Sequence, residues 1–409
     1  MRVLLAPGGM YPEPGGVPVT TAAVSLHASA VAQALAAGWC SQRPEDRLTL
    51  LPVADGAAGS AAVFPPSMVA GRVVLQASGP LGQVREADLI RLAQREEGQT
   101  DGAAESSSGS RATWFLDAAR LVALPADRDE AAREALEGTT FGLGQALAAA
   151  LGHTAPGDVL VVGLARSAVH DGGAGLIDGL GGAAGATTAV EGRELVLALA
   201  DDVALGGLSG VGQGLVAVTS LGAEQAQERD RAACAAAATL VTQLTERSGS
   251  GGPGRRVLPV VGADRSVPGT LSVTSWGSGA GGGAGLVLQV LGARAVPGPR
   301  VMASLLGLDA AVSHNDLVVT AAGEVYDVLA DSLTAVVGQA ASDRALPVVL
   351  VTGRGLVPRG ELAAAGVSAT YSLEEAGAGA AGAWDGEDRQ ALRRRLEDMG
   401  ARLARSWSR

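Results

Sequence analysis

The 409-residue sequence contains no lysine, so its 31 basic residues are all arginines. Any phosphate site must therefore use arginine, backbone N–H groups or a metal, because lysine's compact ammonium group is missing. Aromatic residues make up only 3% of the chain, which predicts a core of Val, Leu and Ala. The formal net charge of -11 disfavours a nucleic-acid groove as the main purpose of the protein.

Cysteines and long apolar runs are scarce as well. Cys40 and Cys234 are isolated, which excludes a disulfide framework and a cysteine-based zinc pattern. The first apolar run is too short for a signal peptide, and no run approaches the length of a membrane span. We therefore expect a cytoplasmic protein with no membrane partner.

Short apolar runs that end in loops recur along the chain, as in parallel α/β proteins. Strands are expected at residues 2–6, 48–53, 159–162, 194–200, 317–320 and 348–352. Helices are expected at residues 20–39, capped by Thr20 or Thr21, at 139–151, and after the glycine-rich segment 276–285. Leu392, Leu396, Met399 and Leu403 have helical spacing and predict an amphipathic terminal helix, which would dock on the body or on a second subunit. The sequence therefore does not decide between a monomer and a homodimer.

Three segments have no apolar period. Residues 96–111 and 248–256 are predicted to be mobile surface loops, and residues 377–383 a linker of glycine and alanine.

Two glycine-rich segments are candidate ligand sites. The strand at 159–162 runs into a loop that carries Arg166, Ser167, His170 and Asp171, and then into Gly172 and Gly173. Glycine lets backbone N–H groups approach a ligand, and the start of a helix favours anions. The second segment, WGSGAGGGAG at 276–285, also precedes a helix. Its candidate phosphate contacts are Gly277, Ser278, Gly281, Gly282 and Gly283.

Six motifs, in order, resemble those of the bacterial glycerate kinase family of the single-chain, two-domain type. They are LLPVADG (50–56), SGPLG (78–82), TTFGLGQAL (139–147), SAVHDGGAGL (167–176), LGARAVPG (291–298) and DLVVT (316–320). Their shared order and spelling make the resemblance specific, and it extends from residue 2 to about residue 375.

Several polar residues of the family pattern are replaced. The family's APDSFKG is APGGMY here, and DGGEG is DGAAG, which keeps Asp55 but puts Ala58 at the glutamate's place. TGEGSLDAQT is TAAGEVYDVL, so Ala322 stands at another glutamate's place and only Glu324 and Asp327 could compensate. The scaffold residues are kept, whereas the polar residues at strand ends are largely lost.

The resemblance implies an enzyme of two α/β domains with its active site in the cleft between them. A flavodoxin-like three-layer domain would comprise residues 1–75 and 286–375, a second α/β domain residues 76–285, and a linker with the terminal helix residues 376–409. The implied reaction is phosphorylation of glycerate or a related small hydroxy acid by ATP with Mg2+. Asp171 would be the catalytic base, Arg166, Ser167 and His170 would bind the substrate, and Asp55 and Asp202 would hold the metal.

Each of these residues also has a structural reading. Asp171 could cap the following helix, Asp55 could serve a turn, and Arg166 could pair with a neighbouring carboxylate. His170 is more often a hydrogen-bonded loop residue than a ligand, and the segment 276–285 could be a linker. Two hypotheses follow: an ATP-dependent kinase, or a degenerate relative (a pseudokinase) that binds a ligand or regulates another protein.

Overall fold

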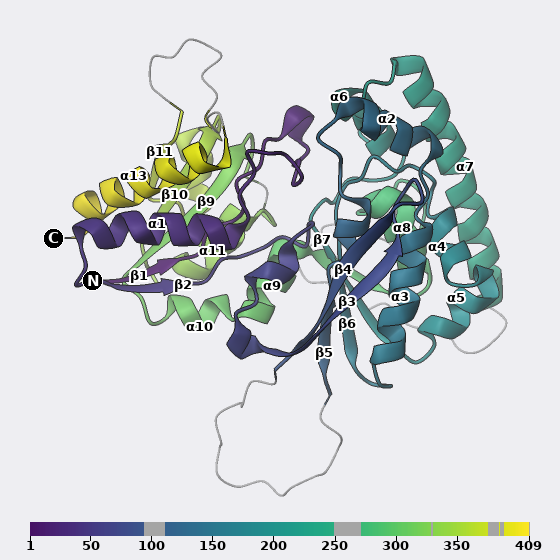
Figure 1. Ribbon diagram of the computed structural model, residues 1–409, viewed down its shortest axis with the longest axis horizontal. Helices are drawn as coiled ribbons and strands as arrows, with labels where there is room; N and C mark the ends of the chain where they lie inside the picture. Colours follow the sequence, from purple (N-terminus) through teal and green to yellow (C-terminus); the bar gives the residue numbers. More distant parts are fainter. Residues whose placement is uncertain (94–110, 249–270, 329, 375–383, 385–387, 409) are drawn as a thin grey trace, which may run out of the picture.

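The computed structural model describes residues 1–93, 111–248, 271–328, 330–374, 384 and 388–408. It contains two α/β bodies side by side, each built around its own sheet (Figure 1). The predicted loops at 96–111 and 248–256 and the linker at 377–383 lie almost wholly outside the described residues.

The first sheet is built from both ends of the chain. Its strands are parallel in the order β11 (Ala369–Ser372), β10 (Val348–Gly355), β9 (Leu317–Val325), β1 (Arg2–Leu5) and β2 (Arg47–Leu50). When the five strands are renumbered 1 to 5 in chain order and read from β2 to β11, the sheet has the flavodoxin-like order 2-1-3-4-5. The predicted flavodoxin-like domain made from the two chain ends is confirmed.

Helices cover both faces of this sheet, because its strands are apolar on both sides. Leu5 packs with α1 (Ala28–Gln42) and α13 (Arg389–Trp407), whereas Leu4 packs with α9 (Gly298–Leu306) and α11 (Leu333–Ser342). The short helices α10 (Leu308–Val312) and α12 (Arg359–Ala364) complete this body. The result is a three-layer α/β arrangement.

The second sheet uses the middle of the chain. Its order is β3 (Val69–Ser78), β4 (Val84–Leu92), β5 (Thr113–Leu116), β6 (Val159–Leu164), β7 (Glu194–Leu199) and β8 (Arg294–Pro297). The pairs β3–β4 and β4–β5 are antiparallel and the other pairs are parallel. The chain thus changes sheet between β2 and β3 and again between β8 and β9, whereas the predicted boundaries at residues 75 and 286 fall within β3 and α8.

The helices of the second body are α2 to α8. Their bounds are α2 (Arg128–Glu137), α3 (Phe141–His153), α4 (Ala174–Gly179), α5 (Gly182–Val190), α6 (Val211–Val218), α7 (Ala223–Ser248) and α8 (Ala284–Val290). The long helix α7 forms the outer edge of this body (Figure 1). None of the helices in the described ranges is long and apolar enough to cross a bilayer.

One predicted helix begins at the wrong residue. Helix α1 starts at Ala28 with His27 as its cap, and residues 20–27 are loop and turns. Ala22, inside the predicted helix, packs together with Val19 in a small apolar cluster that includes Leu124 and Val218 of the second body. A tertiary contact between the bodies therefore overrides the local pattern.

The terminal helix α13 docks on the body of the protein rather than standing free. It packs along α1 at close range, since a Cβ on Gly38 would lie 1.8 Å from the carbonyl oxygen of Glu397. A Cβ on Gly400 would lie 2.2 Å from the carbonyl oxygen of Leu35. Glycine on both helices allows this approach.

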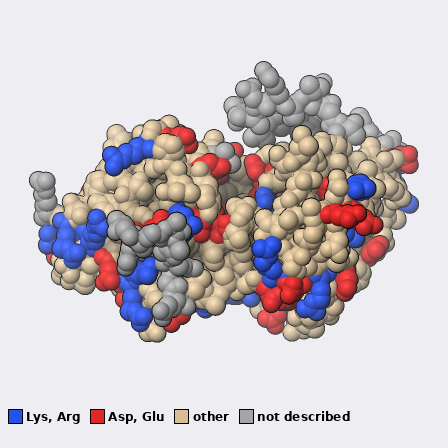
Figure 2. All heavy atoms as spheres, turned by 90° about the horizontal axis from the view of Figure 1, so that it is seen from above, with Lys and Arg blue, Asp and Glu red and all other residues tan. Residues whose placement is uncertain are grey.

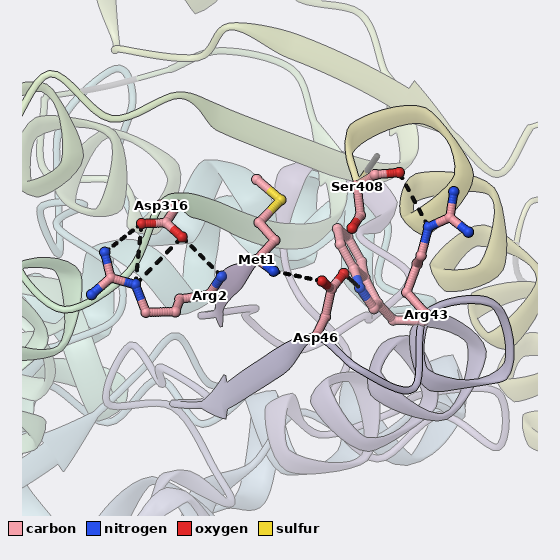
Figure 3. A network of polar contacts seen from close by, with 7 residues as sticks. Met1, Arg2, Arg43, Asp46, Asp316 and Ser408 are labelled. Carbon is pink, nitrogen blue, oxygen red and sulfur yellow. Dashed lines mark hydrogen bonds and ion pairs between the residues drawn. The ribbon is translucent and has the colours of Figure 1, made fainter.

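Polar contacts tie the chain ends to the first sheet (Figure 3). Asp46 accepts hydrogen bonds from the amino group of Met1 at 2.7 Å and from the indole of Trp39 at 2.9 Å. Nearby, Arg2 pairs with Asp316 at 2.5 Å, which joins the starts of β1 and β9. Arg43 donates to the carbonyl oxygen of Ser408 at 3.2 Å, after the end of α13.

The two bodies share an apolar cluster and a bridging loop. Phe64 and Phe115 meet edge to face with ring centroids 5.4 Å apart, inside a cluster that draws residues from both sheets. The loop after β1 extends to the second body, where Thr21 Oγ1 donates to the carbonyl oxygen of Leu124 at 2.8 Å. The surface between the sheets is therefore built from both bodies.

Candidate functional site

A cleft of about 570 Å³ lies where the carboxyl ends of strands from both sheets meet. Segments that follow β1, β2 and β9 of the first sheet form one part of its lining, and segments that follow β6, β7 and β8 of the second sheet form another. Ligand sites of open α/β sheets are found at this edge.

The lining is strongly acidic. Figure 2 shows carboxylate atoms around the hollow between the two lobes of the molecule. Seven lining residues carry carboxyl groups: Glu13, Asp55, Asp201, Asp202, Glu324, Asp327 and Asp331. Among the described lining residues, only Arg166 and His27 have basic side chains.

Arg166 is committed to a carboxylate. Its Nε donates to Asp201 Oδ2, and each of the two side chains is 16% exposed. The other oxygen of Asp201 accepts from the amide of Val203 at 2.9 Å. The structural alternative for Arg166, an ion pair with a neighbouring carboxylate, is therefore present.

Asp55 and Asp202 line the cleft, as their predicted metal role requires. Asp55 Oδ1 accepts from the amide of Ala57 at 2.9 Å, and burial raises the pKa of its carboxyl group. Asp202 accepts from the indole of Trp276 at 3.3 Å. No group of three or more His, Cys, Asp or Glu side chains in the described residues could hold a metal ion, so a protein-only cage is ruled out for that part of the chain.

Close backbone packing fixes the Asp55 loop against the second body. A Cβ on Gly298, at the start of α9, would lie 1.6 Å from the carbonyl oxygen of Asp55. A Cβ on Gly56, which has φ of 96°, would lie 2.4 Å from the carbonyl oxygen of Ala198 in β7. A side chain at Gly56 would push the Asp55 loop away from β7 of the second body, and one at Gly298 would push it away from the junction of β8 and α9.

The loop after β1 supplies a tyrosine, a histidine and a glutamate. The hydroxyl group of Tyr11 lies 3.0 Å from Nδ1 of His27, within hydrogen-bond distance. Burial, followed by Asp55, raises the pKa of Tyr11, and burial lowers that of His27. Burial, then Glu324 and Asp55, raises the pKa of Glu13 to about 8. Tyr11 and His27 are thus neutral at pH 7, and Glu13 is largely protonated.

In the segment after Thr320, the family's glutamate is replaced by Ala322, and two other acidic residues follow, Glu324 and Asp327. Ala322 lines the cleft, and so do Glu324 and Asp327. Glu324 accepts from the indole of Trp384 at 3.0 Å and from the hydroxyl group of Tyr326. Both carboxylates therefore remain in the cleft although the glutamate is lost.

Three helix starts also reach the cleft. His27 and Ala28 of α1, Pro297 and Pro299 around the start of α9, and Ser332 and Leu333 of α11 are lining residues. The first turn of a helix has free N–H groups and the positive end of the helix dipole. The start of α1 has no side-chain cap. In α11, Ser332 caps the amide of Ala335 at 3.3 Å, and in α9, Pro299 has no N–H group, so the start of α1 is the best suited of the three to phosphate oxygens.

Asp171 lies elsewhere and is fully engaged in hydrogen bonds. Its carboxylate accepts from the amides of Thr140 at 2.7 Å, Gly173 at 2.9 Å and Gly175 at 3.1 Å, and from the Thr140 hydroxyl at 2.9 Å. These contacts join the starts of α3 and α4. Among the described residues that line the cleft, Asp171 is not included.

Ser167 and His170 are also away from the lining and buried. Ser167 Oγ accepts from the amide of Val169 at 3.1 Å. His170 Nε2 lies 3.0 Å from Asp230 Oδ1 on α7, and Nδ1 has no partner among the described residues.

The two glycine-rich segments pack against each other inside the second body. The amide of Gly172 donates to the carbonyl oxygen of Gly282 at 2.9 Å, and a Cβ on Gly283 would lie 2.5 Å from the carbonyl carbon of Gly172. A Cβ on Gly173 would lie 2.6 Å from the side chain of Val287. Gly277, Ser278 and Gly281 belong to the same buried loop, in which Ser278 Oγ accepts from Leu205. None of these glycines lines the cleft in the described chain.

Tyr11, Glu13 and His27 were not identified from the sequence. The available signal was the loop PGGMYPEPGG directly after the first strand, since the carboxyl end of a central parallel strand faces the ligand edge. Because α9 and α11 follow the strands β8 and β9, the same signal could have identified their starts as part of the site.

Comparisons with known proteins agree with this architecture. A profile of the glycerate kinase family matches residues 23–201 and 257–408. A protein of uncharacterised function from Mycobacterium bovis is 28% identical over 377 residues, which is 92% of this chain and 84% of that protein. A glycerate kinase of Bacillus subtilis is 33% identical over 159 residues, 39% of this chain and 36% of that protein.

A solved structure is similar over nearly the whole chain. The candidate glycerate kinase 2 of Salmonella typhimurium LT2 superimposes with a TM-score of 0.63 at 20% identity, covering 99% of this chain and 98% of that one. The predicted two-body α/β fold is confirmed, and the family match includes most of both bodies. The chain belongs to the glycerate kinase family.

Proposed function

We propose that the protein transfers a phosphoryl group from Mg2+–ATP to a hydroxyl group of a small acceptor bound in the cleft. Family membership supports a kinase-like activity. The observation that carries the proposal is the meeting of three helix starts and several carboxylates in one cleft at the carboxyl ends of both sheets.

The starts of α1, α9 and α11 would bind the nucleotide phosphates. Because the chain has no lysine, backbone N–H groups have to supply most of the positive potential. Gly8 and Gly9 line the same region, and glycine leaves the backbone accessible there.

Mg2+ fits the carboxylates on the condition that the nucleotide provides further ligands. Magnesium is usually held by one or two carboxylates together with phosphate oxygens and water. Asp55 and Asp202 are the residues we assign to it, and the ion would offset the charge of the transferred group. A cage of three protein ligands is not needed for this role.

The ionised form of Glu13, whose share grows as the pH approaches 8, is our candidate for receiving the proton of the acceptor hydroxyl group. A general base works best when its pKa is close to the operating pH, and the pKa of Glu13 is raised to about 8 by burial and by Glu324. Asp171 would then have a structural role, because its carboxylate already holds the starts of α3 and α4.

The test is ATP binding by calorimetry with Mg2+, followed by an ADP-release assay with glycerate, glycerol and an amino alcohol. Glu13→Gln should lower the rate at least about a hundredfold and leave ATP binding within about twofold. The matched control is Glu361→Gln on α12, which should change neither. Full activity of Glu13→Gln would remove the residue from this role, and failure to bind Mg2+–ATP would overturn the proposal.

A second candidate is a family member that binds its ligand without phosphoryl transfer. It is favoured by the pairing of Arg166 with Asp201, which leaves the cleft lining without an uncommitted guanidinium among the described residues. Nucleotide binding with no ADP release for any acceptor would support it.

A further inference from the structure

We propose that His27 binds a phosphate oxygen of the nucleotide through its Nε2–H group, in a tautomer that the hydroxyl group of Tyr11 selects. The proposal rests on the proposed function, since it assigns one phosphate contact of that same site. Tyr11 is a positioning residue in this arrangement, because it acts on the ligand through the ring of His27. No lysine is present anywhere in the chain to make such a contact.

A short backbone bridge brings the two residues together. The amide of Met10 donates to the carbonyl oxygen of Leu26 at 2.8 Å, and the amide of Leu26 donates to the carbonyl oxygen of Met10 at 2.9 Å. The side chains of Met10 and Leu26 are buried in the first body. Successive side chains of extended backbone point to opposite sides, so Tyr11 and His27 leave the bridge on the other side. Their rings meet edge to face with centroids 6.0 Å apart.

Glycine on two sides fixes the position of Tyr11. A Cβ on Gly9 would lie 2.3 Å from Cε2 of the tyrosine ring and 2.6 Å from its hydroxyl oxygen. A Cβ on Gly323 of β9 would lie 2.5 Å from the carbonyl oxygen of Tyr11. A side chain at either glycine would therefore move the hydroxyl group away from His27.

The hydroxyl group of Tyr11 is the donor in its contact with His27. It lies 3.0 Å from Nδ1 of the imidazole and has no other hydrogen-bond partner among the described residues. Burial, followed by the charges of Asp55 and Asp117, raises the pKa of Tyr11, so the hydroxyl group keeps its proton. Neutral imidazole has one nitrogen that accepts and one that donates. Because Nδ1 accepts from Tyr11, the ring proton is on Nε2.

The Nε2–H group is available to a ligand. His27 lines the cleft and keeps accessible surface there. The loop after β2 covers the other edge of the ring, since a Cβ on Gly59 would lie 2.9 Å from both Nδ1 and Cε1 but 3.7 Å from Nε2. In the described part of the chain, Nε2 has no hydrogen-bond partner. Burial, then Arg389 and Arg120, lowers the pKa of His27, so the ring is a neutral donor at pH 7.

The surroundings of His27 suit a phosphate group. His27 directly precedes α1, and its side chain does not cap the helix. The free N–H groups of the first turn and the Nε2–H group therefore offer donors from adjacent positions. Gly8 and Gly9 line the same cleft. By its place in the motif, Tyr11 stands where APDSFKG has its lysine, so the same change removes a cation and adds the group that orients His27.

The affinity of the full-length protein for Mg2+–ATP, measured by calorimetry, tests the contact. His27→Phe keeps a ring but has no donor, and it should weaken binding about tenfold or more. His27→Gln should stay within about threefold of the parent, because its amide nitrogen can take the place of Nε2. Tyr11→Phe releases the tautomer and should weaken binding by about twofold to fivefold. The control His153→Phe changes an exposed residue at the end of α3 and should have no effect.

Nitrogen NMR detects the tautomer directly. The chain has four histidines, so the signals of His27 are assigned by their loss in His27→Gln. The parent should carry the proton on Nε2, and Tyr11→Phe should show a larger share of the other tautomer. Addition of Mg2+–ATP should shift the Nε2 signal of the parent. A parent protein with the proton on Nδ1, or a His27→Phe variant with parental affinity, would overturn the proposal.

The two proposals fail in different ways. If His27→Phe weakens Mg2+–ATP binding but no acceptor supports ADP release, the phosphotransferase proposal is overturned and the His27 contact stands. If the parent releases ADP and His27→Phe binds Mg2+–ATP as tightly as the parent, the phosphotransferase stands and the His27 contact is overturned. A parent protein that does not bind Mg2+–ATP would overturn both.

Discussion

Replacing Asp171 with asparagine should destabilise the second body without altering the cleft. One carboxylate oxygen accepts from the amide of Gly173 at 2.9 Å, and the other from the amides of Thr140 at 2.7 Å and Gly175 at 3.1 Å. Asparagine has one acceptor oxygen and one NH2 group. Whichever way it turns, the NH2 group faces at least one backbone N–H donor.

The magnitude follows from these contacts. Each hydrogen bond to a charged group contributes about 1.5–3 kcal/mol, so losing one or two of them should lower the free energy of unfolding by about 2–4 kcal/mol. For a body of this size the melting temperature should fall by roughly 5–10 °C. The loss should arise in the second body, where both attached helices lie.

The assay is urea unfolding followed by circular dichroism, with Asp178→Asn, an exposed residue of α4, as the control. The control should stay within about 0.5 kcal/mol of the parent protein. Calorimetry on the folded variant should show Mg2+–ATP binding unchanged. An Asp171→Asn protein with parental stability but no phosphoryl transfer would refute the structural role and restore the catalytic one.

Other substitutions test the packing and charge of the two bodies. Burial raises the pKa of Asp117 to about 7 from an ordinary 3.8, so the folded state keeps a proton that the unfolded state has lost between those pH values. The free energy of unfolding should therefore fall as the pH rises through that window, by up to about 1.4 kcal/mol per pH unit, and should stay level above it. In pH-dependent melting curves, the Asp117→Asn variant should show a flatter decline. Gly38→Ala should cost about 1–3 kcal/mol in urea unfolding because its Cβ meets a backbone carbonyl of α13, whereas Gly152→Ala, with open space around it, should be neutral or stabilising. A double-mutant cycle of Arg166→Ala and Asp201→Ala should give a coupling of about 1–3 kcal/mol, and no coupling would contradict their pairing.

The sequence was sufficient for the architecture because buried parallel strands have a continuous apolar signature. The strands at β1, β6, β7 and β10 and the terminal helix α13 were predicted close to their observed bounds. The hairpin of β3 and β4 was missed: its strands carry charged residues between the apolar ones, and seven of their nineteen positions are exposed.

The candidate site was harder to predict, because sequence proximity does not show which face of a loop a side chain occupies. Arg166 and Asp171 are five positions apart, yet only Arg166 reaches the cleft. The glycine-rich loops suggested phosphate, whereas Gly172 and Gly283 serve the close packing of backbone on backbone. Whether the site performs catalysis remains a prediction for the experiments above.

The pairing of β1 has a consequence for the order in which the protein is built. Val3 pairs with Leu48 on one edge and with Leu317 on the other, and the helix that covers the same face is α13. While the chain is being synthesised, β1 and β2 lack their inner neighbour until β9 emerges. They lack the covering helix until α13 emerges. The six strands of the second sheet are complete once β8 has been made. Domains usually fold as units in the order of their synthesis, but here the body that contains the first strand is the last to be finished.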